Sequence, residues 1–188
     1  MTSDGNAVRQ RDASRTTHAL LAAAQELFGQ QGYERTTLRE IGELAGVDAA
    51  LIARYFGNKA SIYIAALEAE EHTDPNTTGH AGQGIAERVI DRATRLGPTP
   101  VLRSIVTPDH DPGIGRAARA VLARRTIGPL RARMTSSGLD HPDLRAEIAI
   151  AALAGIALAR AAGTLELLSS APTADVVDIC EQILPDLA

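Results

Sequence analysis

The sequence has little that would support internal cross-linking or membrane insertion. Cys180 is the only cysteine among 188 residues, so no disulfide can form within the chain. It lies in an apolar helical pattern, which predicts a buried thiol. No run of about 18 apolar residues occurs, which excludes a transmembrane helix. The first dozen residues also lack the apolar core of a signal peptide. We therefore expect a cytoplasmic protein without a membrane partner.

Residue patterns typical of enzymes and metal sites are also missing. The five histidines are scattered, and none forms a His-x-x-x-His or Glu-x-x-His pair on a helix face. There is no Gly-x-Ser-x-Gly turn for a nucleophilic serine. Asp109-His110-Asp111 comes nearest to a metal cluster, but helix capping explains Asp111. We expect no catalytic residue, no metal and no cofactor.

Basic charge is not in excess, and Lys59 is the only lysine in a chain of net charge −4. Residues 1–59 contain seven of the 19 basic and seven of the 23 acidic residues, which leaves twelve and sixteen for the remainder. Bulk charge therefore gives no attraction to nucleic acid. Binding to phosphates would require cations clustered on one face, or doubled by dimerisation.

The most informative stretch runs from Thr36 to Lys59 and predicts two short helices joined by a tight turn. Thr37 and Glu40 have the spacing of a capping box, in which each satisfies an amide of the other. Gly46 can end the first helix in the left-handed conformation, and Asp48 can cap the second.

Each of these helices has one apolar face. The expected inward residues are Ile41, Leu44 and Ala45 in the first helix, and Leu51, Ile52 and Phe56 in the second. Ala49, Ala50, Ala53 and Arg54 then point outward, with Tyr55 at the edge. Gly42 costs the first helix about 0.5–1 kcal/mol of propensity, which predicts a close approach of the two helices there.

This stretch and its flanks resemble the tetracycline-repressor-like (TetR) family of transcriptional regulators. The resemblance covers roughly Ser14 to Leu67 and rests on cap, turn, apolar plug and a Tyr-Phe-Gly-Asn-Lys ending in that order. The matching residues are Ala24, Leu27, Phe28, Gly32, Tyr33, Thr36, Thr37, Ile41, Ala45, Gly46, Val47, Tyr55, Phe56, Asn58, Lys59 and Ile62.

The resemblance implies that the second helix of the motif lies in a DNA major groove. Arg39 and Arg54 are the candidates for reading bases or holding phosphates, whereas alanine methyls offer contact but no hydrogen bond. We expect Thr37, Tyr55 and Lys59 to contact the sugar-phosphate backbone of the DNA. The predicted DNA-binding set is Thr37, Arg39, Ala49, Ala50, Arg54, Tyr55 and Lys59.

The pattern predicts an all-α protein of about nine helices, with a three-helix head at 14–59 and a helical body at 60–188. Residues 1–13 are polar and aperiodic, which predicts a flexible arm before a first helix that ends at Gly32. Asn58 caps the helix that links head and body. Residues 73–84 form a polar loop.

Proline and apolar periods mark the body helices. Thr99-Pro100, Asp111-Pro112 and Pro142 open three of them, and Gly128-Pro129 should break or kink the second. The helix predicted over residues 85–96 has an apolar stripe on one side and Arg88, Arg92 and Arg95 on the other. Six arginines between 116 and 133 suit either a second anion-binding surface or, as we favour, a solvated face beside acidic helices.

The last two long helices, from Pro142 and from about Pro172, are broadly apolar. With their symmetry mates they would form a four-helix dimer interface, as the resemblance also implies; the alternative is a monomeric bundle. The leading interpretation is a homodimeric regulator, most simply a repressor. It would read a pseudo-palindromic operator in double-stranded DNA and be released by an unidentified small molecule bound in the body.

Two other functions stay open. The neutral head, and Ala53 where the family commonly has tyrosine, also suit a helical sensor or interaction protein that has lost DNA binding. An enzyme built on a helical bundle is the third interpretation, and a bound metal or cofactor in the purified protein would revive it.

Overall fold

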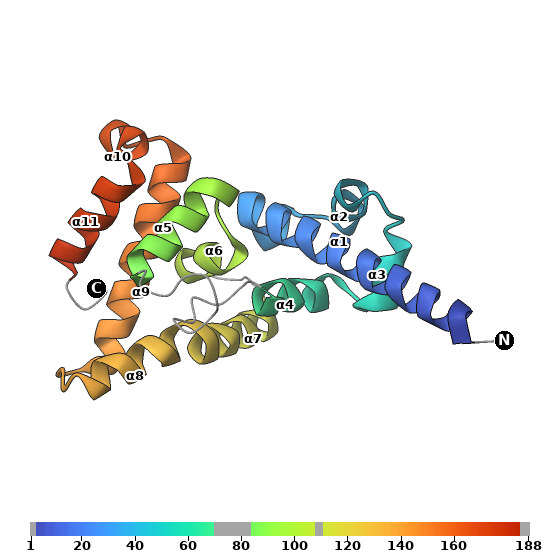
Figure 1. The fold of residues 1–188 in the computed structure, drawn as a ribbon, viewed down its shortest axis with the longest axis horizontal. Coiled ribbons are helices and arrows are strands. Elements are labelled where there is room, and N and C mark those ends of the chain that lie inside the picture. The colour runs from blue at the N-terminus through green and yellow to red at the C-terminus, as the bar shows by residue number, and fades with distance from the viewer. Residues whose placement is uncertain (1–2, 70–83, 108–110, 185–188) are drawn as a thin grey trace.

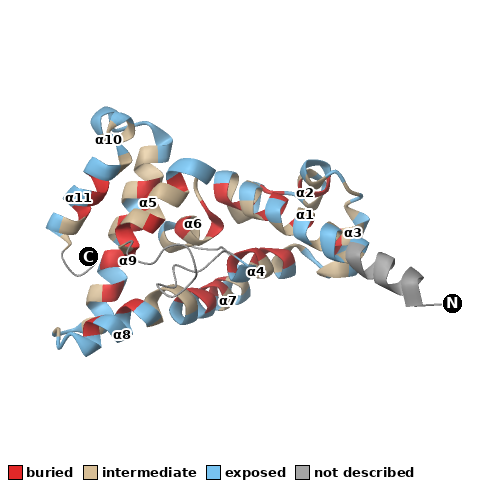
Figure 2. Ribbon diagram, in the orientation of Figure 1, coloured by how far each residue is buried: buried red, intermediate tan, exposed pale blue. Residues whose placement is uncertain are grey.

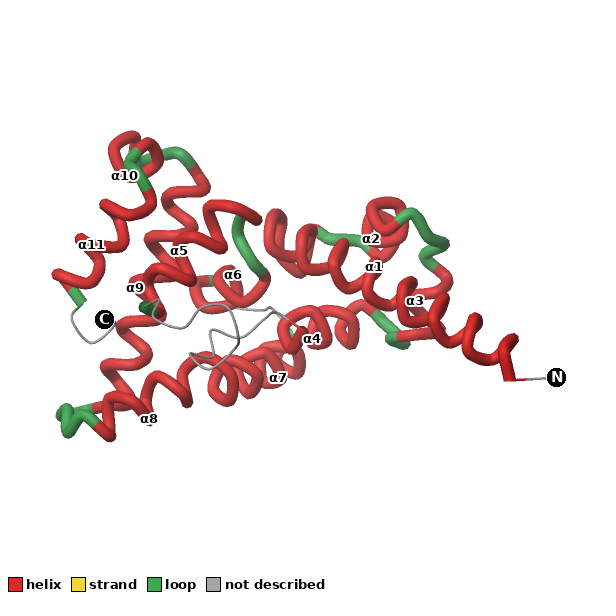
Figure 3. Tube along the Cα trace, in the orientation of Figure 1, coloured by secondary structure: helices red, strands yellow, loops and turns green. Residues whose placement is uncertain are grey.

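A computed structural model describes residues 3–69, 84–107 and 111–184, and every regular element in these ranges is a helix (Figures 1 and 3). This confirms the all-α prediction. The elements are α1 (Ser3–Arg35), α2 (Leu38–Ala45), α3 (Ala50–Tyr55), α4 (Lys59–Ala69), α5 (Ile85–Leu96), α6 (Pro100–Val106), α7 (Pro112–Leu122), the π-helical segment η1 (Ala123–Ile127), α8 (Gly128–Ser136), α9 (Pro142–Ala162), α10 (Glu166–Ser170) and α11 (Thr173–Ile183). The short α10, and α8 as a separate helix, account for the excess over about nine.

Helix α1 is longer than the sequence suggested. It begins at Ser3, whereas the sequence placed the start of the first helix at Ser14. That residues 1–13 form a flexible arm stays a prediction. In Figure 1 this end of α1 projects past the other helices. Gly32 interrupts the helix as expected, with φ 82° and ψ 172°.

The head core lies between α1, α2, α3 and α4, and α7 of the body joins it. Its buried members are Leu20, Ala23, Ala24, Phe28, Ile41, Ile52, Ile62, Tyr63, Ala66, Leu67, Ala118 and Val121. The Tyr63 ring lies 5.0 Å, between centroids, from the rings of both Phe28 and Tyr33. Head and body therefore share packed side chains beyond the predicted boundary at residue 60.

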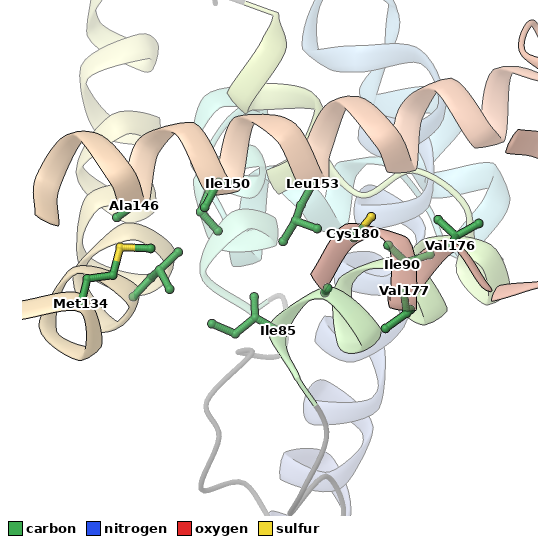
Figure 4. Packing of buried hydrophobic residues seen from close by; sticks show 12 residues of the cluster. Ile85, Ile90, Met134, Ala146, Ile150, Leu153, Val176, Val177 and Cys180 are labelled. Atoms are coloured by element: carbon green, nitrogen blue, oxygen red, sulfur yellow. The ribbon is translucent and has the colours of Figure 1, made fainter. Parts of the chain in front are cut away.

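The body core forms where α5, α8, α9 and α11 meet (Figure 4). Ile150 and Leu153 of α9 contribute to it, as do Ile85 and Ile90 of α5. Cys180 of α11 is buried here, which confirms the predicted environment of the thiol, and loss of hydration raises its pKa.

One arginine of α5 is not where the sequence placed it. Arg88 is only 8% exposed, whereas the apolar Leu96 is 64% exposed at the end of the helix. The buried residues of α5 include Ala86 and Ile90, which belong to the body core together with residues of α9 and α11.

Most predicted helix boundaries are confirmed. The Thr99 hydroxyl accepts from the Leu102 amide at 3.3 Å, and Asp111 Oδ1 accepts from the Gly113 and Ile114 amides at 2.7 and 3.0 Å. Before Gly128-Pro129 the α-helical pattern is interrupted by the π-helical segment η1, and α8 begins at Gly128.

Helices α9 and α11 include many exposed residues (Figure 2), and several of these are large and apolar. Leu144 and Ile148 of α9 are 56% and 53% exposed, and Ile179 and Ile183 of α11 are 54% and 71% exposed. Arg160 holds the connection between these helices, donating to the carbonyls of Leu168 and Ala171 at 2.6 Å each. No described helix has the length and hydropathy to cross a membrane.

Candidate nucleic-acid interface

Helix α2 begins with the capping box expected from its sequence. The Thr37 hydroxyl accepts from the Glu40 amide at 3.2 Å, and Glu40 Oε2 accepts from the Thr37 amide at 2.7 Å. Hydrogen bonds from the Thr37 hydroxyl and then from its amide lower the pKa of Glu40. The start of α2 is therefore fixed by two reciprocal side-chain contacts.

The turn between α2 and α3 is also as predicted. Gly46 adopts the left-handed conformation, with φ 68° and ψ 29°, and the Val47 amide donates to the Gly42 carbonyl at 3.0 Å. Asp48 Oδ1 accepts from the Ala50 amide at 2.8 Å, which satisfies one free donor at the start of α3. A Cβ on Gly42 would lie 2.9 Å from the Val47 carbonyl oxygen, so the predicted close approach is confirmed.

Helix α3 presents one face to the head core and the other to solvent. Ile52 is fully buried, and Leu51 and Phe56 pack partly buried against the core, as expected. Leu44 of α2 is the exception to the predicted inward faces, since it is 48% exposed. At eight residues, α2 has room for one buried stripe, and Ile41 and Gly42 occupy it.

The structure brings most predicted DNA-binding residues to one exposed region around α2 and α3. Thr37, Arg39, Ala50 and Arg54 are exposed, and Ala49 is half-buried. Arg39 is already paired: its Nε donates to Glu43 Oε1 at 2.8 Å, and this contact raises the pKa of the guanidinium.

Tyr55 and Arg54 lie beside each other at the end of α3. The Tyr55 ring packs partly buried against the head core, and the Arg54 guanidinium carbon lies 5.8 Å from its centroid. Arg54 therefore remains exposed with its side chain beside a fixed aromatic ring, which reduces its freedom without neutralising its charge.

Lys59 makes contacts inside the head. Its Nζ donates to the Glu34 carbonyl at 3.2 Å and lies 4.4 Å from the centroid of the Tyr33 ring. Partial burial lowers the pKa of Lys59, although Glu34 and Glu40 oppose that shift. The lysine thus joins the start of α4 to the end of α1. Its contact with phosphate stays a prediction.

The end of α1 is one of the points where head and body are joined, and sequence reasoning missed the residue that forms this contact. Arg103 of α6 donates from Nε to the Gly29 carbonyl at 2.8 Å and from a terminal nitrogen to the Gln30 carbonyl at 2.7 Å. Three further carbonyls next to the Gly32 break accept from side chains: Gln31 from Arg35, Gly32 from Thr36 and Glu34 from Lys59. No spacing in the sequence could show this, because the partners of Arg103 lie more than 70 residues away.

The body has a groove between α6, α7 and α9 that could hold a small molecule. Its volume is about 400 Å³, and its walls are mainly apolar. The lining residues are Ser104, Ile105, Val106, Gly115, Ala118, Arg119, Leu122, Ile127, Glu147, Ile150 and Ala151. A smaller cavity of about 210 Å³ lies at the joint, bordered by Phe28, Tyr33, Tyr63 and Arg103 among others.

The structure bears on two further features discussed from the sequence. Asp109 and His110 lie outside those residues, as does most of the 73–84 loop. Asp111 acts as a helix cap, and no metal-binding cluster occurs in the described part.

Two of the arginines at 116–133 pair with carboxylates: Arg124 with Glu68 at 2.9 Å and Arg131 with Asp143 at 3.2 Å. This agrees with the solvated face that we favour.

Sequence comparisons match both halves of the chain to one family. A model described as "Bacterial regulatory proteins, tetR family" matches residues 20–66, and one described as "Tetracyclin repressor-like, C-terminal domain" matches residues 80–187. The transcriptional regulator RutR of Escherichia coli K12 is 42% identical over 59 residues, 31% of this chain and 28% of its own. TcmR of Streptomyces glaucescens is 37% identical over 68 residues, 36% and 30% of the two chains. The matches to these curated relatives thus span less than a third of their length.

Solved structures with the same fold extend the likeness over most of the chain. The fatty acid degradation regulator FadR of Bacillus halodurans has a TM-score of 0.62 at 14% identity, covering 89% of this chain and 96% of its own. FadR of Bacillus subtilis, in complex with stearoyl-CoA, has a TM-score of 0.52 at 15% identity with the same coverage. At these identities the likeness concerns the fold alone.

Proposed function

This chain belongs to the TetR family of bacterial regulatory proteins, and from that premise we propose that it is a DNA-binding transcriptional regulator. The observation that carries the proposal is the capped helix-turn-helix itself, in which α3 keeps an exposed face opposite its buried one. Such a face can enter a major groove, which is wide enough to admit a helix. The regulator would act in the cytoplasm and needs no enzymatic activity.

Arg54 is the principal candidate for direct contact with a base. It is exposed at the end of α3, and no carboxylate pairs with it in the described residues. Arg39 would have to give up its ion pair with Glu43 to bind DNA. A DNA phosphate could replace the Glu43 carboxylate, so we assign Arg39 to the DNA backbone and not to a base. Thr37, Ala49, Ala50, Tyr55 and Lys59 complete the proposed surface, with Ala50 able to meet a thymine methyl.

A homodimer formed through α9 and α11 would present two such heads. The exposed Leu144 and Ile148, together with Ile179 and Ile183, give an apolar surface of the kind that a self-complementary interface buries. Two heads would read a pseudo-palindrome with half-sites about 34 Å, or a small multiple of that, apart. Doubling the contacts also compensates for a head without net positive charge.

The groove between α6, α7 and α9 is the proposed effector site, and the effect of its occupant would be release from DNA. Its mainly apolar walls suit a small molecule with a substantial hydrophobic part. The FadR structure with stearoyl-CoA indicates that this fold accommodates a ligand, although it does not identify one for this chain.

Selection from random-sequence DNA, together with the DNA that flanks the coding region, tests the proposal. We expect enrichment of a palindromic sequence, and a log affinity that falls linearly with log salt. Arg54→Ala should weaken binding by about 1–3 kcal/mol and relax preference at one position of each half-site. Arg131→Ala, at an exposed position of α8, is the matched control and should bind as the unmodified protein does.

The second candidate is a sensor of the same fold without DNA binding. The pairing of Arg39 with Glu43 favours it, because it withdraws one of the few cations from the head surface. Absence of any salt-sensitive, sequence-specific binding in the selection would establish this alternative over the regulator.

A further inference from the structure

The groove between α6, α7 and α9 combines a buried apolar lining with two exposed charges. Ala118, Leu122 and Ile150 line it and are 2%, 7% and 6% exposed. Arg119 of α7 and Glu147 of α9 also line it, and both are exposed. The two charges therefore lie where the groove meets solvent, on different walls, and the buried side chains form its inner surface.

The protomer makes no use of these two charges within the described residues. Arg119 and Glu147 form no ion pair there, either with each other or with a third residue, whereas Arg124 and Arg131 nearby in the sequence do pair with carboxylates. A guanidinium presents several N–H donors and a carboxylate only acceptors. The mouth of the groove thus offers one charged donor and one charged acceptor to an occupant.

The groove also has room for an apolar group. Gly115, Ala118 and Ala151 contribute at most a methyl group each to its lining, and the volume of about 400 Å³ is within the range of small-molecule pockets. Val106 is a larger lining residue, yet it is 48% exposed. An apolar occupant would remove this surface from water, which is favourable.

We propose that the groove binds a zwitterionic amphiphile, an apolar chain or ring that carries a carboxylate and an ammonium group at one end. The apolar part would lie against Ile150 and Val106, the carboxylate would accept from Arg119, and the ammonium group would donate to Glu147. A ligand with a single charge would leave one of the two wall charges without a partner, and a neutral ligand would leave both. The inference rests on the proposed function of the groove as an effector site and adds the chemical class of its occupant.

A series of probes that differ only at the polar end tests this class. 2-Aminodecanoate carries both charges, decanoate lacks the ammonium group, nonylamine lacks the carboxylate, and 1-nonanol is neutral. Their affinities for the protein are measured by calorimetry at neutral pH, below the concentrations at which the probes aggregate. We expect 2-aminodecanoate to bind at least about tenfold more tightly than each of the others, the factor that one hydrogen bond to a charged group supplies.

Substitution of each charge should change the preference among the probes in a different direction. With Arg119→Gln, 2-aminodecanoate and decanoate should each lose about tenfold in affinity, whereas nonylamine should bind as before. With Glu147→Gln, 2-aminodecanoate and nonylamine should lose affinity and decanoate should not. Arg116→Gln on α7 and Glu166→Gln on α10 remove exposed charges outside the groove lining, and they are the matched controls.

Amphiphiles also adsorb to exposed apolar surface, so the location of binding requires its own variant. Ala151 lines the groove and is exposed, and Ala151→Trp would therefore fill the groove from its rim without replacing a buried residue. It should abolish binding of 2-aminodecanoate. Ala132→Trp, at an exposed position of α8, is the control and should bind normally. Circular dichroism of both variants establishes that the helical fold is retained.

The proposal is overturned if the charged and neutral probes bind equally well or not at all. It is also overturned if Arg119→Gln and Glu147→Gln leave the preference unchanged, or if binding survives Ala151→Trp. None of these measurements requires DNA. Failure of the unmodified protein to select any DNA sequence would instead refute the proposed DNA-binding function, and the calorimetry would still decide the ligand class.

Discussion

Gly42 illustrates how a single missing side chain sets the geometry between α2 and α3. The nearest atoms to a Cβ at this position are the Val47 carbonyl oxygen at 2.9 Å and the Ala49 nitrogen and Cα at 3.0 Å. These are backbone atoms of the turn, so they can give way only if the turn itself moves. We therefore predict that Gly42→Ala destabilises the fold by about 1–3 kcal/mol, the usual cost of overpacking, although alanine is the better helix former.

The measurement is urea unfolding, with Gly155→Ala as the matched control. A Cβ on Gly155, within α9, would meet no atom of the protomer within 4 Å. That substitution should stabilise the protomer by about 0.5–1 kcal/mol, the helix-propensity gain alone. Equal stabilisation by both substitutions would show that the turn adapts to a methyl group, and that the close approach does not constrain it.

Single residues whose roles depend on near neighbours could be predicted from the sequence. Thr37, Gly46 and Asp48 act within three residues of themselves, and the structure confirms all three. Lys59 and Arg103 could not be assigned, because their partners lie 25 and more than 70 residues away. A cation without a local partner looks the same in a sequence whether it faces a phosphate or a carbonyl.

At the scale of elements, the start of α2 should make the stability of the head depend on pH. The pKa of Glu40 is lowered in the folded protein by its bonds from Thr37, below a usual value of about 4.3. The stabilisation is therefore present above that value and is lost as the pH falls through the lowered pKa. We predict that Glu40→Gln is less stable than the unmodified protein at neutral pH, and that the difference vanishes in acid.

Chemical unfolding at several pH values measures this, and Thr37 provides the controls. Thr37→Ala should cost about 1 kcal/mol at neutral pH through loss of the cap, whereas Thr37→Ser keeps the hydroxyl and should cost little. A difference between Glu40→Gln and the unmodified protein that is independent of pH would contradict the assigned cause.

The ends of the helices were easier to predict from the sequence than which sides of the helices are buried. Proline, glycine and capping side chains act locally, so the starts of α6, α7 and α9 follow from sequence. The solvent faces of α5 and α9 do not, because Arg88 is buried and Ile148 is exposed against their ordinary preferences. Only the neighbouring helix, or a second protomer, decides which side of an apolar helix meets water.

At the scale of the whole molecule, head and body are joined by three kinds of contact. Helices α4 and α7 share the head core, Arg103 fastens α6 to α1, and Arg124 of η1 pairs with Glu68 of α4. The packing therefore continues across the predicted domain boundary at residue 60. This continuity is what would let an event in the body reach the head.

The proposed homodimer gives the last prediction. Ile148 of α9 and Ile179 of α11 are each more than half exposed in the protomer, so a charge at either position should leave the fold intact. In an isologous interface each residue would be buried twice, once per protomer, and a carboxylate there would lose its hydration without a partner. We therefore expect Ile148→Glu and Ile179→Glu to sediment as monomers.

The DNA affinity of both variants should fall at least about 100-fold, because the second head no longer binds as part of the same molecule. Leu96→Glu is the matched control, since Leu96 is 64% exposed at the end of α5. Dimers that persist in both isoleucine variants would place the interface on another surface.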